Sequence, residues 1–226
     1  MEARCKIWGM LFSLLALLLA LPGAARGGDA VRERAQANDA MNALRQAAAA
    51  GDASVPDALL AVARDAARDG GIREYAVQHL GAWMRAGHDA ARVEQMLWEL
   101  ADDPVAGTAA ILQLHHAGGP SLRGGRAWAD LLARRMDRDG LRNAEKATLL
   151  LVAAESGVPA ALPHARDWAA ATSDIVLLRC ALQTVGRLGS RADVAFLDRL
   201  AEEKPLGEAT ETWEKARRKL AEGPMP

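Results

Sequence analysis

Along most of the chain, apolar residues recur at a spacing of three or four, and clusters of glycine, proline and aspartate interrupt them. This is the period of helices that bury one face. In the stretch Ser173–Leu188, for example, Leu178, Ala181 and Val185 share a face, and Gly189 ends the pattern. Alanine, leucine, arginine and glutamate dominate over strand-forming residues. The sequence therefore predicts an all-α chain.

The predicted helices alternate between an outer and an inner helix of a pair. The outer helices are expected to begin near residues 54, 88, 128, 157 and 190, and the inner ones near 72, 104, 141, 175 and 206. Successive inner helices are thus about 32, 37, 34 and 31 residues apart. Hairpins at one period predict an α-solenoid of about five antiparallel helix pairs, in which neighbouring pairs cover each other's apolar faces.

Breaks in the periodicity divide the chain into four parts. Residues 26–53 carry one weak apolar stripe over 29–50, which suits an N-terminal capping helix. The repeat domain is expected over 54–222, with a glycine-rich loop inserted near 117–126 and a disordered tail at 223–226. The first 25 residues have a different composition.

Those first 25 residues have the order of a secretory signal peptide. Arg4 and Lys6 precede an apolar run, Ile7–Leu21, and small residues follow up to a predicted cleavage site after Ala25. The run is shorter than the ~20 residues of a membrane span. We therefore expect an exported protein, periplasmic or secreted, with no membrane contact after cleavage. An uncleaved N-terminal anchor is the alternative.

Short polar residues stand where most predicted helices begin, and side chains of this kind cap the exposed amides of a first turn. The predicted caps are Asp69, Asp103, Asp139 and Asp174 before inner helices, and the capping boxes of Ser54 with Asp57 and of Ser190 with Asp193 before outer ones.

Two of the repeats, Ile72–Gly87 and Leu177–Glu203, share an arginine near the start, small residues in the middle and an apolar-glycine step before a second glycine. They resemble HEAT repeats, in particular the short type of the phycobilisome lyases. The matching positions are Ile72, Arg73, Ala76, Leu80 and Gly81 in one repeat, and Ala181, Val185, Gly186, Leu188 and Gly189 in the other.

The HEAT resemblance implies a superhelix whose inner helices line a concave surface on which partners dock. The chain departs from the pattern in three ways: Arg179 stands one position late, Ala106 occupies the place of an arginine, and the third and fifth inner helices lack the Leu-Gly step. Tetratricopeptide repeats, with a period of about 34 residues, are the alternative family.

Residues that could carry chemistry are few. The sequence lacks a Gly-x-Ser-x-Gly elbow, a Walker loop and a His-Glu-x-x-His motif, so no catalytic residue, metal ligand or cofactor is predicted. The adjacent His115 and His116 point about 100° apart on a helix, which does not suit one metal ion. Cys180, the lone cysteine after cleavage, is expected to be buried. A lyase-type enzyme with an exposed Cys180 is the alternative.

The net charge and its distribution along the chain indicate what kind of partner the protein binds. Without residues 1–25 the chain has 26 basic and 28 acidic residues, a net charge of -2 that gives it no general attraction to nucleic acid. Helical spacing nevertheless places polar and mostly basic side chains opposite the buried faces of four inner helices. These candidate partner-binding residues are Glu74, Gln78, Arg85, Arg142, Lys146, Arg179, Gln183, Arg187, Lys215 and Lys219. We therefore expect a non-catalytic scaffold or adaptor that binds another protein on a mildly basic groove.

Overall fold

The computed structural model describes residues 52–119 and 125–223, together with positions 35, 39, 42, 43, 46 and 47. The six isolated positions are helical and fall inside the helix predicted over 29–50. The predicted signal peptide, most of the predicted capping helix, residues 120–124 of the inserted loop and residues 224–226 of the tail lie outside the described residues.

The described residues form ten α-helices and two short 3-10 helices, with no strand among them, which confirms the all-α class. None of these helices is both long and apolar enough to cross a membrane. The chain divides into two compact units, Met1–Ala117 and Gly118–Pro226.

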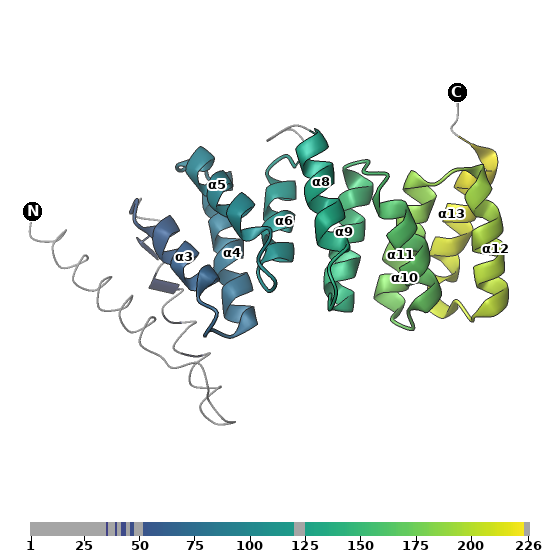
Figure 1. Cartoon of the computed structure of the whole chain (residues 1–226), viewed down its shortest axis with the longest axis horizontal. Helices are drawn as coiled ribbons and strands as arrows, with labels where there is room; N and C mark the ends of the chain where they lie inside the picture. The colour runs from purple at the N-terminus through teal and green to yellow at the C-terminus, as the bar shows by residue number, and fades with distance from the viewer. Residues whose placement is uncertain are drawn as a thin grey trace, which may run out of the picture. The chain divides into compact units, whose positions relative to one another are not determined.

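In the first unit, α4 is the central helix. It packs against the other three helices, and α5 packs against α6. Leu80, Leu97 and Ile111 are fully buried between them. The helices α4 and α6 thus form one layer, and α3 and α5 the other (Figure 1). Their bounds are α3 Val55–Arg64, α4 Gly70–Arg85, α5 Ala90–Leu100 and α6 Gly107–His116.

In the second unit, α11 is central and packs against α9, α10 and α13. One layer consists of α9, α11 and α13, and the other of α8, α10 and α12 (Figure 1). The bounds are α8 Gly125–Met136, α9 Asn143–Glu155, α10 Ala161–Ala171, α11 Ile175–Leu188, α12 Val194–Glu203 and α13 Thr210–Glu222, with 3-10 helices at Arg191–Asp193 and Gly207–Ala209. The helices α4, α6, α9, α11 and α13 begin within four residues of the predicted inner-helix starts.

Three of the four predicted aspartate caps are confirmed. The carboxylates of Asp69, Asp103 and Asp174 accept hydrogen bonds from the first amides of α4, from those preceding α6 and from those of α11. The prediction for Asp139 is wrong, because α9 starts later and is capped by the Glu145 carboxylate, which accepts from the Arg142 amide at 3.1 Å. A carboxylate inside the first turn can satisfy the same exposed amides.

The two predicted capping boxes differ in outcome. Ser190 and Asp193 form one, with the Ser190 amide donating to the Asp193 carboxylate at 2.8 Å. Ser54 does not, because its hydroxyl donates to the Asp52 carboxylate at 2.8 Å instead. The chain before α3 turns at Asp52, so the serine side chain is drawn backward and away from the helix.

Apolar periodicity predicts that the first outer helix continues to Asp69, but α3 ends five residues earlier, at Arg64. Asp65 is extended, and its carboxylate accepts from the Ala67 amide at 3.0 Å and from Arg68 Nε at 3.1 Å. Local side-chain hydrogen bonds of this kind compete with the helical ones. They explain why apolar periodicity over 54–69 continues past the end of the helix.

Polar side chains join helices that lie about one repeat apart in sequence. In the first unit, buried Arg73 donates to the Ala63 carbonyl at 2.8 Å and pairs with Asp103 at 2.6 Å, 30 residues away. In the second unit, the Thr184 hydroxyl on α11 donates to the Leu150 carbonyl of α9, 34 residues away, at 3.2 Å. Neighbouring helices of one layer are thus fixed to each other inside each unit.

Five tryptophans of the described residues lie among leucines at helical spacing, which favours core positions, but their burial differs. Trp83 and Trp128 are buried, whereas the other three are half-buried. Those three are Trp98, Trp168 and Trp213.

Candidate protein-binding groove

The exposed face of α11 is fixed by the residues that it buries. Leu178, Ala181 and Val185 lie in the core of the second unit, and the Thr184 hydroxyl is held by α9. On a helix with about 100° per residue, the opposite side then carries Arg179, Gln183 and Arg187. All three are exposed, as their spacing of four predicts.

The orientation of α13 is fixed by its contacts with α12. Trp213 Nε1 donates to the Leu197 carbonyl at 2.8 Å, and Arg217 pairs with Asp198. The Arg217 guanidinium also lies 5.9 Å from the centre of the Trp213 ring. Lys215 stands two residues after Trp213, and Lys219 two residues after Arg217, so each lies about 200° round the helix from a residue that contacts α12. They therefore point away from α12.

The helices α11 and α13 approach each other closely at Gly186. A Cβ atom at that position would lie 2.8 Å from the Ala216 Cβ and 2.9 Å from the Ala216 Cα. Contacts this short require a glycine on one helix and a small residue on the other. The crossing therefore has little side-chain volume.

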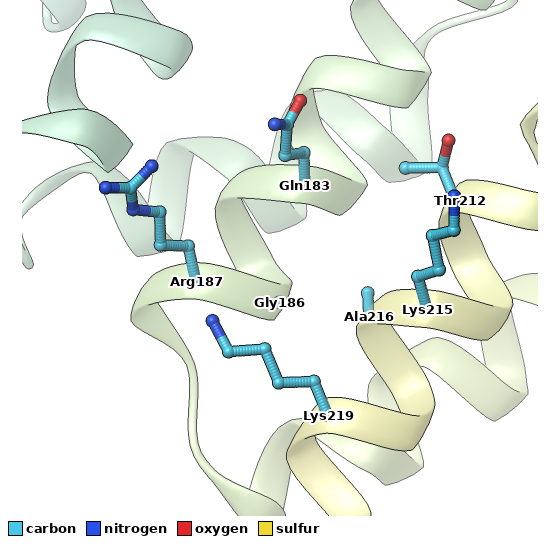
Figure 2. A pocket seen from close by; sticks show the side chains of 7 residues that line it. All are labelled: Gln183, Gly186, Arg187, Thr212, Lys215, Ala216 and Lys219. Atoms are coloured by element: carbon cyan, nitrogen blue, oxygen red, sulfur yellow. The ribbon is translucent and has the colours of Figure 1, made fainter. Parts of the chain in front are cut away.

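An open cavity of about 350 Å³ lies over this crossing, and we call it the α11–α13 groove. Gly186 and Ala216 lie between its polar side chains (Figure 2). The residues that line it are Gln183, Gly186, Arg187, Thr212, Lys215, Ala216 and Lys219. Four of the predicted partner-binding residues are thus brought together, three of them cationic, and no carboxylate lines the cavity.

The cations of the groove differ in their ion pairing. In the described part of the second unit, neither Arg187 nor Lys219 has an ion-pair partner, and Figure 2 shows the Lys219 side chain extending toward that of Arg187. Lys215 is paired with Glu211 at 2.6 Å. Cations gathered without a carboxylate give the groove a positive potential that attracts anionic groups.

Arg179 belongs to the same positive region, although it does not line the cavity. The positive charge of Arg179 acts on Glu211 of α13, whose carboxyl has a pKa below its ordinary value. The hydrogen bond and charge of Lys215 are the main cause, and the charge of Arg179 adds to them. The field of Arg179 therefore reaches across the two helices.

The two predicted residues of α9 lie elsewhere. Lys146 places its ammonium 5.4 Å from the centre of the Trp168 ring on α10, in the other layer. Arg142 donates to Glu145 at 2.9 Å beside the start of its own helix. Neither side chain lines the groove. Helix α9 is apolar on most sides, so its sequence does not predict which side faces the core.

The three predicted residues of the first unit lie on α4. Gln78 and Arg85 are exposed and Glu74 is half-buried. Arg85 donates to the Gln113 side chain of α6 at 2.7 Å, so its outer end is already engaged. These residues are accessible on the first unit.

Cys180 is buried, as predicted, and burial raises the pKa of its thiol above the ordinary value. A raised pKa keeps the sulfur protonated and weakly nucleophilic. His115 is half-buried and His116 exposed. No group of three potential metal ligands occurs among the described residues.

Two features of the groove were not predicted from sequence. The close approach at Gly186 depends on which residue of α13 faces that glycine, and helical periodicity does not contain this information. Thr212 joins the lining for the same reason. The glycine in the Val-Gly step was the available signal, since glycine inside a helix often marks close approach of another element.

Comparisons of this chain with protein-family models, curated proteins and solved structures find no match. The groove is therefore interpreted from its own residues.

Proposed function

We propose that this protein is an exported, non-catalytic scaffold or adaptor, and that its α11–α13 groove binds another protein. The observation that carries the proposal is the grouping of Gln183, Arg187, Lys215 and Lys219 around one cavity. Interfaces depend on a few anchor residues, and arginine is enriched among them. Arg187 and Lys219, exposed and without an ion-pair partner among the described residues, provide such anchors for an acidic surface.

The architecture that we propose for these helix pairs is a HEAT-like solenoid. Support comes from the two-layered packing inside each unit and from contacts between residues about one repeat apart, such as Arg73 with Asp103. Stacked hairpins leave one surface of each layer open to partners. A tetratricopeptide-like arrangement is the alternative architecture.

The export signal is part of the same proposal. Its support is the order of basic, apolar and small residues over 1–25. Sequencing of the mature N-terminus is expected to place cleavage after Ala25, whereas an intact N-terminus in the membrane fraction would indicate the anchored alternative.

Catalysis by a lyase-type thiol is a separate hypothesis, and thiol labelling tests it. Because Cys180 is buried and its pKa is raised, we expect a charged maleimide to modify the native protein slowly and the unfolded protein rapidly. Equal rates in the two states would favour the enzymatic alternative over the scaffold.

Charge reversal in the groove tests the binding function. The full chain, tagged at the C-terminus and expressed with its own leader, is crosslinked in its compartment and the captured proteins are quantified. We expect Arg187→Glu with Lys219→Glu to reduce at least one captured protein by tenfold or more, since cations at the centre of a site have large effects.

The matched control changes the same charge elsewhere in the second unit. Arg199 on α12 and Arg218 on α13 are exposed and do not line the groove. Arg199→Glu with Arg218→Glu is expected to leave capture unchanged, and circular dichroism verifies that both double variants are folded. If the groove variant retains every protein that the control captures, the groove is not the binding site.

A further inference from the structure

The exposed residues Arg179, Gln183 and Arg187 form a stripe along α11, and this stripe continues beyond the groove to Val176. Among the described residues, Val176 is the one large apolar side chain that is mainly exposed, at 60%. It stands seven residues before Gln183 and eleven before Arg187, and at about 100° per residue both lie within about 20° of it round the helix. An exposed valine therefore shares one line with the polar side chains of the groove.

The distance along that line follows from the rise of the helix. Eleven residues at about 1.5 Å separate Val176 from Arg187 by about 16 Å. Arg179 and Gln183 stand between them in that order, so the stripe begins with an apolar side chain, has one cation a turn later, and ends with the cation Arg187 beside the groove. A ligand that used the whole stripe would need apolar and anionic groups at opposite ends.

The dimensions of the groove favour an extended chain over a helix as the occupant. The close contact of Gly186 with Ala216 keeps α11 and α13 near each other, and the cavity of about 350 Å³ is at the small end for a ligand site. A helix with its side chains is about 10 Å across, whereas an extended segment inserts single side chains. An extended chain covers about 16 Å with five residues.

Charge complementarity identifies the chemistry of that segment. Arg187 and Lys219 have no counter-charge in the described part of the chain, and Lys215 shares one carboxylate, Glu211. Glutamate or aspartate side chains supply the missing charges, and guanidinium groups bind carboxylates in a planar, two-pronged geometry. The valine at the other end requires an aliphatic side chain.

We propose that the stripe and groove together bind an extended acidic segment of a partner protein in one direction. The segment places an aliphatic side chain on Val176 and, four to six residues away, one or two carboxylates against Arg187 and Lys219. This inference rests on the proposed function, since it specifies the partner that the groove receives.

Synthetic peptides test this arrangement. The parent nonapeptide carries one leucine and, five residues away, two glutamates at alternate positions, with serine elsewhere and a fluorescein label; it is made in both chain directions. One derivative replaces leucine by serine and another replaces both glutamates by glutamine. Binding to the purified mature protein is followed by fluorescence anisotropy up to millimolar peptide.

We expect the parent peptide, in one chain direction, to bind wild-type protein about fivefold more tightly than the serine derivative, because burying an aliphatic group is worth roughly this factor. Val176→Ser should abolish that difference and leave the serine derivative unaffected. The glutamine derivative, and every peptide with the Arg187→Glu and Lys219→Glu variant, should bind at least tenfold more weakly.

Different results separate the two proposals. If parent and serine derivative bind equally in both directions, or if no peptide binds, the directed extended segment is wrong, while the proposed function is still judged by protein capture. If the glutamine derivative binds as well as the parent, recognition of carboxylates is wrong. If 10 mM inorganic phosphate displaces peptides whose binding is insensitive to Val176→Ser, the groove is only a general anion site and the inference fails.

Discussion

The helices α4 and α11, which share an arginine, small residues and an apolar-glycine step, use their arginines in opposite ways. In α4, Arg73 stands eight residues before the glycine of the Leu-Gly step, and it is buried against Asp103. In α11 the arginine stands seven residues before Gly186, where Arg179 is exposed. A shift of one residue rotates a side chain by about 100° and here moves a cation from core to surface.

The glycines of the two helices differ in what they meet. Gly81 faces the side chain of Gln113, whose Cβ would be 2.7 Å from a Cβ at Gly81, and that glutamine accepts a hydrogen bond from Arg85. Gly186 faces Ala216, and the space above the crossing is open. Beside Gln113 the cation Arg85 is engaged, whereas beside the crossing of Gly186 with Ala216 the cation Arg187 has no ion-pair partner among the described residues.

This comparison teaches that one helical pattern can produce either a structural contact or a binding surface. In α4, Arg73 pairs with the Asp103 carboxylate, which caps the next helix of the layer, and so fixes two helices together. In α11, the corresponding Arg179 faces solvent. Variants that exchange or disturb these positions therefore separate the two roles.

The largest expected effect is on the stability of the first unit. Arg73→Leu removes two hydrogen bonds of a buried guanidinium, one to the part-buried Asp103 carboxylate and one to the Ala63 carbonyl, and hydrogen bonds of a charged group of this kind are together worth about 2–4 kcal/mol. Arg179→Leu should change the free energy of unfolding by less than about 0.5 kcal/mol, because Arg179 is exposed. Urea denaturation followed by circular dichroism measures both. Equal losses would mean that the two arginines are not used differently.

The next effect concerns the helix crossing in the second unit. Gly186→Ala places a Cβ against Ala216, and overpacking of this kind costs about 1–3 kcal/mol, more than the ~1 kcal/mol that alanine gains over glycine in a helix. Adding Ala216→Gly should recover part of the loss. The double-mutant cycle is measured by urea denaturation, and a stabilising Gly186→Ala would show that the crossing is looser than described.

A smaller effect on the free energy of unfolding is expected when the pH is lowered. Burial raises the pKa of the Asp103 carboxyl, but hydrogen bonds from the Ala106 and Val105 amides and the charge of Arg73 outweigh it, so this pKa lies below the ordinary value. A lowered folded-state pKa stabilises the fold above about pH 4, and the contribution disappears as pH falls through the folded-state pKa.

Asp103→Asn tests that dependence. The wild type should be more stable than this variant at pH 7, and the difference between their free energies of unfolding should shrink from pH 4 downward. Urea titrations at pH 7, 4 and 2 measure it. A difference that stays constant across this range would show that the carboxylate is not held in its charged form by the fold.

The smallest effect is on ligand affinity in the second unit. Glu211 is the carboxylate that pairs with Lys215 beside the groove. Glu211→Gln should raise the affinity for acidic peptides about twofold, since exposed ion pairs are weak. Glu202→Gln on α12, an exposed position that does not line the groove, is the control. Anisotropy titrations at low salt measure the change, and weaker binding by Glu211→Gln would contradict a cationic site.

The sequence predicted those parts of the structure that depend on local pattern. The all-α class, the starts of the inner helices and the caps at Asp69, Asp103 and Asp174 follow from periodicity and from side chains that bind nearby amides. The rotation of amphipathic α11 and α13 was predictable too, because one of their sides is clearly polar. Four candidate residues therefore meet at one groove.

Other features depend on contacts between distant residues. The position of Lys146 over Trp168 was not predicted. The helix α9 is apolar on most sides, so its few polar residues do not define its rotation. The end of α3 depends on the hydrogen bond that the Asp65 carboxylate accepts from the Ala67 amide. The close approach of α11 and α13 under the groove depends on the contact of Gly186 with Ala216. A one-dimensional pattern specifies which side of a helix faces inward but not which residue it meets there.

The central claim, that the α11–α13 groove receives another protein, is tested most directly by site-specific photocrosslinking in the native compartment. A benzoylphenylalanine is placed at Gln183, which lines the groove, or at Ala195, exposed on α12. The account predicts a discrete crosslinked partner from position 183 that is absent from position 195 and is lost with Arg187→Glu and Lys219→Glu. The same partner crosslinked from both positions, or crosslinking at 183 that survives the charge reversal, would contradict it.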